Sequence, residues 1–262
     1  MTTGTSSPGN EIKLLLAKIN DLAEQSLRDQ TPKWTDFLDP NEREQAEAVL
    51  RAMVGVRFSA YGGYQQSERR RLVIYPDYYL NEMIEPELSF IEVVPNRLGN
   101  EPASPLSHRD YLGAILGLGI NRSKIGDLLV SDNGCQFILV PELQEFIEIN
   151  LEKVANYKVT LKVIDSEQLN LPERRTKEIK TTVASLRLDA LAALGFGDSR
   201  TKMSREIKAE KVKVNWKTVK SPDLQLNPGD IISIRGRGRV EFREVTGKSK
   251  KGRIGIVLIR QL

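Results

Sequence analysis

The spacing of hydrophobic residues changes several times along the chain, and each change predicts a different element. Apolar residues recur at helical spacing over residues 10–28 and again over residues 39–53, which open with an Asp-Pro-Asn-Glu string typical of a helix start. Alternation of apolar and polar residues then predicts strands over residues 54–58 and 71–75. Residues 10–80 are therefore expected to form two helices and a β-hairpin.

A different order of elements is predicted for the middle of the chain. The expected elements are a strand at 90–94, a helix at 107–116, strands at 128–130 and 136–140, a helix opened by Pro141, and a strand at 159–163. This β-α-β-β-α-β order is that of the ferredoxin-like fold, which many RNA-recognition modules use. Only Phe137 lies on the strand where those modules carry stacking aromatic residues, so base stacking on this sheet is not predicted.

Two short helical patterns and a strand follow one another between residues 185 and 215. Ser185 is expected to cap the first helix and Gly195 to end it, while Ser199 is expected to cap the second. On the second helix, Met203 and Ile207 fall on one side, and the basic residues Lys202, Arg205 and Lys208 fall on the other. Further strands are expected at 212–214, 231–235, 240–245 and 254–259, with a basic hairpin tip at 248–251.

Together these patterns predict an α+β protein with several domains. A chain of 262 residues is long enough for one to three domains. The predicted divisions are a disordered tip at 1–9, an N-terminal α/β-hairpin domain at 10–80, a ferredoxin-like domain at 81–166, a polar linker at 167–180 and a C-terminal domain at 181–262.

Charge is distributed unevenly between these regions. Residues 181–262 contain 18 Lys and Arg against 8 Asp and Glu, a net charge of +10, whereas residues 1–180 contain 21 against 27, a net charge of −6. A basic C-terminal region beside a mildly acidic body favours a polyanionic partner for that region. No apolar run is long enough for a membrane span, and the first ten residues resemble neither a secretory signal nor a transit peptide. We therefore expect a cytoplasmic protein without membrane insertion.

Residues that could support catalysis or bind a metal are few. His108 is the single histidine and Cys135 the single cysteine, which excludes a multi-histidine site, an intramolecular disulfide and a cysteine-based zinc cluster. Lys202-Met203-Ser204 is similar to a class I aminoacyl-tRNA synthetase signature, but it lies inside a helical pattern and lacks its partner motif. Gly247-Lys248-Ser249 lacks the first glycine of a P-loop. We therefore predict a protein that is not an enzyme, with no cofactor and no metal.

The C-terminal region resembles the RNA-binding domain named after small-subunit ribosomal protein S4. The resemblance rests on Arg187-Leu188-Asp189, Gly195-Phe196, Ser199-Arg200, Ile207, Val212-Lys213-Val214-Asn215 and Asn227-Pro228-Gly229-Asp230. Glu210 and Trp216 depart from the pattern, because many such domains have glycine at both positions. The resemblance implies an S4-type (αL) RNA-binding fold for residues 181–262.

Over roughly residues 35–262 the chain also resembles the YlmH-like proteins, whose cyanobacterial members have been called photosystem II S4-domain proteins. This resemblance rests on Gly62-Gly63-Tyr64, Leu118-Gly119-Ile120, Ile125-Gly126-Asp127, Val214-Asn215-Trp216-Lys217 and Gly236-Arg237-Gly238-Arg239, with residues 108–114 and 183–189. It implies an RNA-binding, ribosome-associated factor without known catalysis. Some members act in rescue or quality control of stalled large subunits, where they hold peptidyl-tRNA.

Most of the predicted RNA contacts are basic side chains of the S4-type domain. They lie on the second helix and its cap, on the strand that follows, and on a turn where glycines separate arginines, and one precedes the first helix. The set consists of Arg187, Ser199, Arg200, Lys202, Arg205, Lys208, Lys211, Lys213, Asn215, Lys217, Arg235, Arg237 and Arg239. For Arg187, pairing with Asp189 is the alternative to an RNA contact. Because such contacts reach mainly phosphates, RNA shape should determine specificity.

Two groups in the N-terminal domain each have two interpretations. Arg69, Arg70 and Arg71 could protect an edge strand from aggregation or could contact phosphates. The tyrosines are expected to pack in the fold more often than to stack on bases. They are Tyr61, Tyr64, Tyr75, Tyr78 and Tyr79.

The predicted function is that of a monomeric RNA-binding factor that contacts structured rRNA or tRNA on the ribosomal large subunit. The alternative is an adaptor in photosystem II assembly or regulation, in which the acidic body binds a protein partner. A third hypothesis, an RNA-modifying enzyme, has no catalytic residues to support it.

Overall fold

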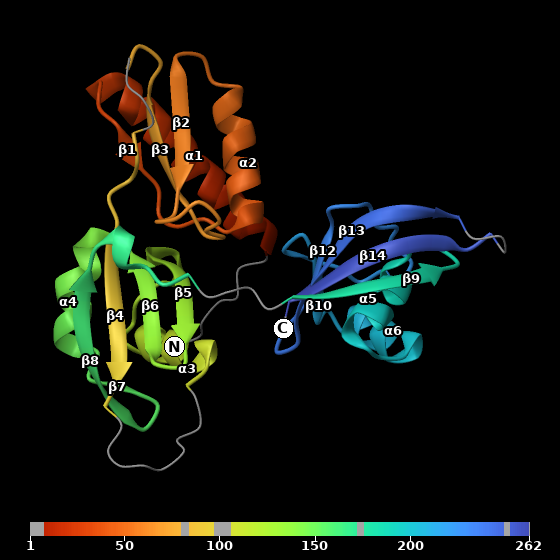
Figure 1. The fold of residues 1–262 in the computed structure, drawn as a ribbon. Helices are drawn as coiled ribbons and strands as arrows, with labels where there is room; N and C mark the ends of the chain where they lie inside the picture. Colours follow the sequence, from red (N-terminus) through yellow and green to blue (C-terminus); the bar gives the residue numbers. More distant parts are fainter. Residues whose placement is uncertain (1–7, 80–83, 97–105, 172–175, 249–251, 262) are drawn as a thin grey trace. The chain divides into compact units, whose positions relative to one another are not determined.

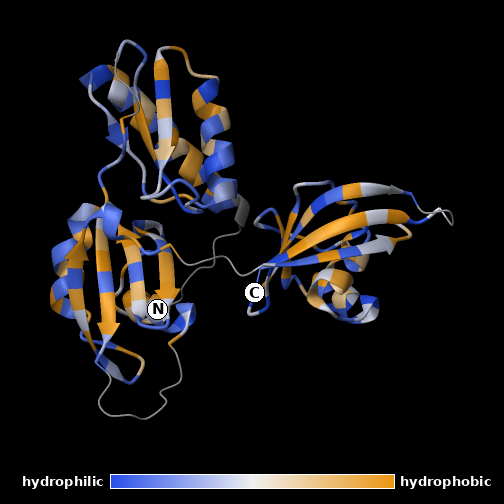
Figure 2. Ribbon diagram, viewed as in Figure 1, coloured by the Kyte–Doolittle hydropathy of each residue, from blue (hydrophilic) through white to orange (hydrophobic). Residues whose placement is uncertain are grey.

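The computed structural model describes residues 8–79, 84–96, 106–171, 176–248 and 252–261, which belong to two compact units (Figure 1). The first unit is Met1–Pro172 and the second is Glu173–Leu262. Apolar residues follow the strands and the helix faces that pack on them (Figure 2).

Helix α1 begins at Pro8, so the predicted disordered tip at 1–9 is wrong for its last two residues, while its first seven lie outside the described residues. Most of the predicted basic tip at 248–251 also lies outside them.

The N-terminal part of the first unit has two helices and a three-stranded sheet. Its elements are α1 (Pro8–Asp29), β1 (Lys33–Trp34), α2 (Pro40–Arg51), β2 (Val56–Tyr61) and β3 (Arg71–Pro76). The predicted pair of helices and the hairpin are confirmed. At the start of α2, the Asp39 carboxylate accepts from the Glu42 amide at 2.8 Å, and the Glu42 carboxylate accepts from the Asp39 amide at 2.7 Å. Strand β1 has two residues, too few for a periodic pattern, and the sequence does not predict it.

Strand β3 is the centre of this sheet, whose order is β1-β3-β2. All six of its residues are buried, including Arg71. A central strand has no free edge, so the interpretation of residues 69–71 as protection for an edge strand is wrong.

Residues 89–96 and 106–164 form a ferredoxin-like body. Its elements are β4 (Ser89–Pro95), α3 (His108–Gly117), β5 (Ile125–Ser131), β6 (Gly134–Leu139), α4 (Gln144–Asn150), β7 (Lys153–Val154) and β8 (Tyr157–Ile164). The sheet order is β5-β6-β4-β8-β7 with antiparallel neighbours, and the two helices share a core with one face of the sheet. The predicted order of elements is confirmed. The helix predicted from Pro141 starts as a 3-10 turn at Pro141–Leu143, and β7 is an added short strand.

The chain that follows β8 returns over the other face of this sheet. Gln136 on β6 donates from Nε2 to Glu92 Oε1 at 3.0 Å and to the carbonyl oxygen of Gln168 at 3.2 Å. Its Oε1 accepts from the amide of Asn170 at 2.7 Å. Residues 168–170 therefore cover part of the face on which RNA-recognition modules stack bases.

Asp127 on β5 joins the N-terminal part to the ferredoxin-like body. Its carboxylate accepts from Tyr64 Oη at 2.7 Å and from the backbone amides of Glu68 and Arg69 at 2.7 and 3.0 Å. The Arg69 guanidinium donates to one carbonyl oxygen of each part. An apolar cluster shared by both parts consists of Phe37, Phe90, Ile138, Val140 and Ile164. The first unit is therefore tied together by polar and apolar contacts.

The second unit has two helices on one face of a six-stranded sheet. Its elements are β9 (Thr176–Val183), α5 (Leu188–Phe196), α6 (Arg200–Lys208), β10 (Val212–Val214), β11 (Lys217–Thr218), β12 (Ile231–Ile234), β13 (Gly238–Lys248) and β14 (Ile254–Gln261). The sheet order is β11-β10-β12-β13-β14-β9. Strand β9 pairs with β14 over its whole length, so the prediction of a linker over residues 167–180 is wrong from Thr176 onward. Glu178, Lys180 and Thr182 make this strand look polar, because they lie on its exposed face.

The first helix of this unit begins and ends later than the sequence predicts. Its N-cap is Arg187 rather than Ser185, because the first helical amides donate to the carbonyl oxygens of residues 222 and 224 and need no side-chain cap. Gly197, at φ 69°, ends the helix in the left-handed conformation. Gly195 is instead buried inside the helix, where an added Cβ would lie 2.6 Å from a methyl group of Val240.

Candidate nucleic-acid interface

Helix α6 separates an apolar side from a basic side, as the sequence predicts. Met203 and Ile207 are fully buried in the core of the second unit. On the other side Lys202, Arg205 and Lys208 are exposed. The predicted cap is confirmed, because Ser199 Oγ accepts from the Lys202 amide at 3.2 Å. The helix therefore presents three cations on a rigid support.

Lys211 extends this basic face beyond the end of α6. Its amide donates to the carbonyl oxygen of Glu206 at 3.1 Å, which keeps it beside the last turn. A shallow depression of about 370 Å³ is lined by Lys202, Arg205, Glu206, Ala209 and Lys211. We use the name α6 basic face for Lys202, Arg205, Lys208 and Lys211.

The strand residues divide between the two faces of the sheet. Val212 and Val214 point into the core, so the intervening Lys213 points away from α5 and α6. Lys213 lies opposite Ser233, which in turn lies opposite Arg239, and these three form a row across the sheet. The Arg239 guanidinium lies 5.7 Å from the ring centre of Trp216. Lys213 and Arg239 are therefore not part of the α6 basic face.

Two predicted contacts share a buried carboxylate. Asp189 at the start of α5 is 7% exposed. Arg200 Nη2 donates to both of its oxygens at 3.0 and 2.9 Å, and Arg187 donates to them at 3.2 and 3.4 Å. The pairing of Arg187 with Asp189, the alternative left open by the sequence, is present. Both guanidinium groups keep an exposed side, so pairing does not exclude a contact with RNA.

Arg237 links the strands of the second unit to its helices. Its guanidinium pairs with Asp198 and, at 3.4 Å, with Glu206, and it lies 5.4 Å from the centre of the Phe196 ring. Hydrogen bonds from Lys202 and then from Arg237 lower the pKa of Asp198 below its ordinary value. Arg237 therefore acts first as a structural brace.

Arg260 on β14 was not among the predicted residues. Its guanidinium lies 5.8 Å from the Phe196 ring centre. Its Nη1 donates to the Phe196 carbonyl oxygen at 3.4 Å. This contact joins residues 64 positions apart, and no local sequence pattern could have revealed it.

Asn215 is engaged within the fold. Its Nδ2 donates to Asp230 Oδ1 at 2.8 Å, and its Oδ1 accepts from the Ile231 amide at 2.9 Å. Asn215 and Trp216 have φ values of 47° and 64°, and Glu210 has 60°. The positions where S4-type domains often have glycine are therefore left-handed here as well. Lys217 and Arg235 are both exposed.

Arg69, Arg70 and Arg71 direct their guanidinium groups to backbone carbonyl oxygens. Arg70 donates to Ser67 and Gln65 within its own turn, and Arg71 donates to Thr35 and Glu87 at 2.7 Å each. These arginines hold segments of the first unit together. The phosphate interpretation has no support in this geometry.

The described residues contain no cluster of three His, Cys, Asp or Glu that could hold a metal ion. Cys135 is buried, and burial raises the pKa of its thiol to about 12. Met203 of the synthetase-like string is part of the core rather than of a catalytic loop. No helix in the described ranges has the length and apolar character needed to cross a membrane.

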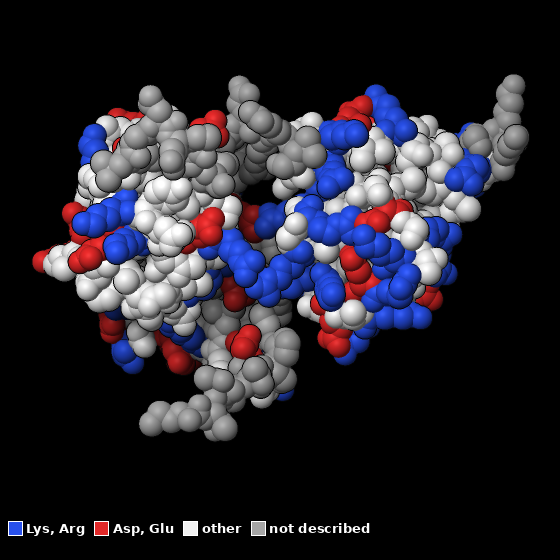
Figure 3. Space-filling model, turned by 90° about the horizontal axis from the view of Figure 1, so that it is seen from below, with Lys and Arg blue, Asp and Glu red and all other residues white. Residues whose placement is uncertain are grey.

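Positive charge does gather on the second unit, where Lys and Arg cover much of the face in Figure 3.

Three family models match the chain, each over a different stretch. The model described as "YlmH, N-terminal" matches residues 13–79, and the one described as "Putative RNA-binding domain in YlmH" matches residues 100–168. The S4 domain model matches residues 186–232. The two resemblances inferred from the sequence are therefore confirmed.

Comparisons with known proteins and with a solved structure agree with the family models. The "Ribosome-associated protein quality control protein P2" of Bacillus subtilis (strain 168) is 38% identical over 230 residues, 87% of each chain. Small ribosomal subunit protein uS4 of Pseudomonas entomophila (strain L48) is 32% identical over 76 residues, 22% of this chain and 37% of uS4. The structure of cell division protein YlmH from Streptococcus pneumoniae matches with a TM-score of 0.52 and 23% identity, over 65% of this chain and 100% of that one. At that identity the last comparison concerns the fold alone.

Proposed function

The chain belongs to the YlmH family, and from this premise we propose that it is an RNA-binding, ribosome-associated factor in the quality control of stalled large subunits. It would contact structured rRNA or tRNA through its S4 domain. The proposal includes a cytoplasmic, monomeric protein that is not an enzyme. The relative named for ribosome-associated quality control supports the cellular role.

The observation that carries the RNA contact is the α6 basic face. Four cations are exposed beside one another, while Met203 and Ile207 anchor the helix in the core. Among the described residues, Arg205, Lys208 and Lys211 form no salt bridge, and Lys202 pairs only with Asp198, at 3.1 Å. Cations that are held in place without a carboxylate partner are available to phosphates.

The thirteen predicted residues then divide into two roles. We propose that the α6 basic face, Lys213, Lys217, Arg235 and Arg239 contact RNA directly. Ser199, Asn215 and Arg237 would position the surface, because their polar groups are engaged within the fold. Arg187 and Arg200 would do both, since Asp189 holds one side of each guanidinium.

Charge reversal on α6 tests the proposal. The variant Lys202→Glu, Arg205→Glu, Lys208→Glu should lose co-sedimentation with large ribosomal subunits. Its residual RNA affinity should depend less on salt. The slope of the logarithm of the RNA-binding constant against the logarithm of the salt concentration should be smaller in magnitude by roughly 2–3, because about 0.7–0.9 counterions are released per phosphate contact.

A matched control uses the same change of charge in the same unit. Lys177, Lys180 and Lys248 are exposed on the strands β9 and β13. Their triple change to glutamate should leave sedimentation nearly unchanged. Equal loss in both variants would mean that net charge, and not the α6 basic face, drives binding. The photosystem II adaptor stays a prediction, and association that survives nuclease and high salt would favour it.

A further inference from the structure

Within the part of the chain that the structure describes, the outer edge of β8 is open over its last residues. Strand β7 pairs with only the first two residues of β8, and the Val159 amide then donates to the carbonyl oxygen of Glu152 at 3.0 Å. In an antiparallel ladder, successive residues direct their backbone groups to opposite sides. The backbone N–H of Val159 points toward β7. The backbone groups of Leu161 and Val163 therefore point to the same side of β8. Among the described residues, no other strand lies beside them there.

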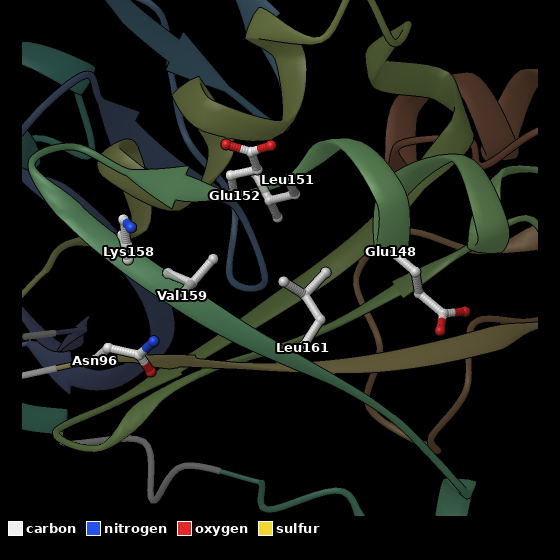
Figure 4. Close-up of a pocket in the computed structure, with 7 residues that line it drawn as sticks. All are labelled: Asn96, Glu148, Leu151, Glu152, Lys158, Val159 and Leu161. Carbon is white, nitrogen blue, oxygen red and sulfur yellow. The ribbon is translucent and has the colours of Figure 1, made fainter.

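Two depressions touch β8, one between β8 and α4 and one at the end of β8. The first, of about 390 Å³, is lined by residues that include Glu148, Glu152, Val159 and Leu161 (Figure 4). Figure 4 shows Val159 and Leu161 rising from the same side of β8, while Glu148 comes from α4. The second, of about 420 Å³, is lined by residues that include Val163, Asp165, Glu167 and Gln144, and also by Leu88, Ser89 and Phe90 at the start of β4. The open edge therefore meets the first depression at Leu161 and the second at Val163.

The chemistry of this edge is apolar and acidic. Val163 is 41% exposed, and Leu161 is half-buried. The exposed carboxylates of Glu148, Glu152, Asp165 and Glu167 line the two depressions, whereas Lys158 is their one lysine. Such a surface repels phosphates and attracts cations. Natural proteins usually block a free strand edge, and here β7 covers only its beginning.

We propose that this edge binds an extended, Lys- or Arg-rich segment of a partner protein, added as a strand beside β8. The backbone of the segment would pair with the N–H and C=O groups of Leu161 and Val163. Its cationic side chains would meet the carboxylates of Glu148, Glu152 and Asp165. Its alternate side chains would pack on the apolar edge. This surface lies in the first unit and is independent of the RNA contact proposed for the second.

A peptide of eight alternating lysine and valine residues is a direct probe. Titrated into the ¹⁵N-labelled full-length protein, it should shift the amide signals of Leu161 and Val163 first. An eight-residue peptide of alternating glutamate and valine should not bind. The double variant Glu148→Lys, Glu152→Lys should weaken binding of the lysine peptide roughly tenfold, which corresponds to about 1.4 kcal/mol.

Proline at position 163 tests the backbone contact itself. The Val163 N–H faces the free edge, so Val163→Pro removes it without breaking the ladder with β4. Peptide affinity should fall roughly three- to tenfold, because one hydrogen bond is lost. Val163→Thr keeps the N–H and the branched side chain and should bind within about twofold of the parent.

Three results would overturn the proposal. They are equal binding of the glutamate peptide, amide shifts that lie away from β8, and unchanged affinity in the Glu148→Lys, Glu152→Lys variant. All three measurements hold even when the proline variant fails to fold. RNA binding measured on the same samples should be unaffected, so failure here is distinct from failure of the proposed RNA contact.

Discussion

Two basic clusters of this chain look alike in the sequence and differ in the structure. Arg69, Arg70 and Arg71 of the first unit donate to backbone carbonyl oxygens. The cations of the α6 basic face are exposed to solvent. One cluster holds segments of chain together, and the other is open to a partner.

The difference teaches that the density of positive charge does not identify a binding surface. A guanidinium has five donors in a fixed fork, which suits carbonyl oxygens that the sheet leaves unpaired. On α6 the helical period places the cations opposite Met203 and Ile207, which the core requires. Whether a cationic side chain faces solvent therefore depends on how the rest of its element packs in the fold, and not on its charge.

The largest expected effect comes from removing Arg71. Its buried guanidinium donates to the carbonyl oxygens of Thr35 and Glu87, and Arg71→Met leaves both unpaired. Each charged hydrogen bond is worth roughly 1.5–3 kcal/mol, partly offset because a buried cation is removed, so the free energy of unfolding should fall by about 2–3 kcal/mol. Urea unfolding in a Trp216→Phe background measures it, because Trp34 then reports on the first unit alone.

The control for Arg71 is an exposed arginine of the same sheet. Arg57→Met on β2 should change stability by no more than about 0.5 kcal/mol. RNA affinity should stay unchanged in both variants. A loss of RNA affinity in folded Arg71→Met would break the comparison, because the first cluster would then contribute to binding as well.

Asp127 gives the next largest effect. Asp127→Ala removes an acceptor of three hydrogen bonds between the N-terminal part and the ferredoxin-like body, and should cost about 2 kcal/mol. Asp127→Asn keeps one acceptor oxygen and should cost about half as much. The same fluorescence assay applies. Equal costs for the two variants would mean that charge, and not the number of acceptors, holds the parts together.

Much of this fold follows from periodicity, and the exceptions have a common physical cause. The helix of Met203 and Ile207 and the order of the ferredoxin-like elements are local patterns. Strand β9 was hidden, because its partner β14 lies about 75 residues further on and only one of its faces is apolar. The start of α5 was misplaced, because its amides are satisfied by residues 222–224 rather than by Ser185.

The candidate site shows the same division. The cations of α6 follow from helical spacing, and their exposure could be predicted. The brace of Arg237 on Asp198, Glu206 and Phe196 could not, because it depends on how the turn between β12 and β13 meets the helices α5 and α6. Sequence spacing therefore predicts a charged helix face more readily than it predicts which charged side chains form ion pairs within the fold.

Acid should act on the first unit through Asp36. Burial by itself raises the pKa of this carboxyl, but Lys124 and Lys18 outweigh burial and the net pKa is lowered. A lowered pKa contributes stability that is present above the ordinary value of about 3.9 and is lost as pH falls through the folded value. The free energy of unfolding of the first unit should therefore fall less steeply between pH 5 and pH 3 in Asp36→Asn than in the parent protein. An unchanged slope would mean that the ion pair with Lys124 contributes nothing.

The smallest expected effect concerns the end of α6, where Glu210 is left-handed at φ 60°. The Lys211 amide donates to the Glu206 carbonyl and the Glu210 amide to the Ile207 carbonyl, a Schellman ending that favours glycine. Glu210→Gly removes a backbone cost of about 1–2 kcal/mol and adds about 0.5–1 kcal/mol of unfolded-state entropy, so stability should rise by about 0.5 kcal/mol. The exposed pair of Glu210 with Lys220 adds little to this balance.

Glu210→Ala separates backbone strain from charge, since it removes the same carboxylate and keeps the Cβ. It should not stabilise the second unit, whose unfolding Trp216 reports in a Trp34→Phe background. Both variants remove a negative charge next to Lys211, so both should tighten RNA binding slightly and equally. Equal stability of the two variants would mean that the left-handed backbone carries no cost here. A gain in RNA affinity for glycine alone would mean that the geometry of the turn, and not only its charge, sets the α6 basic face.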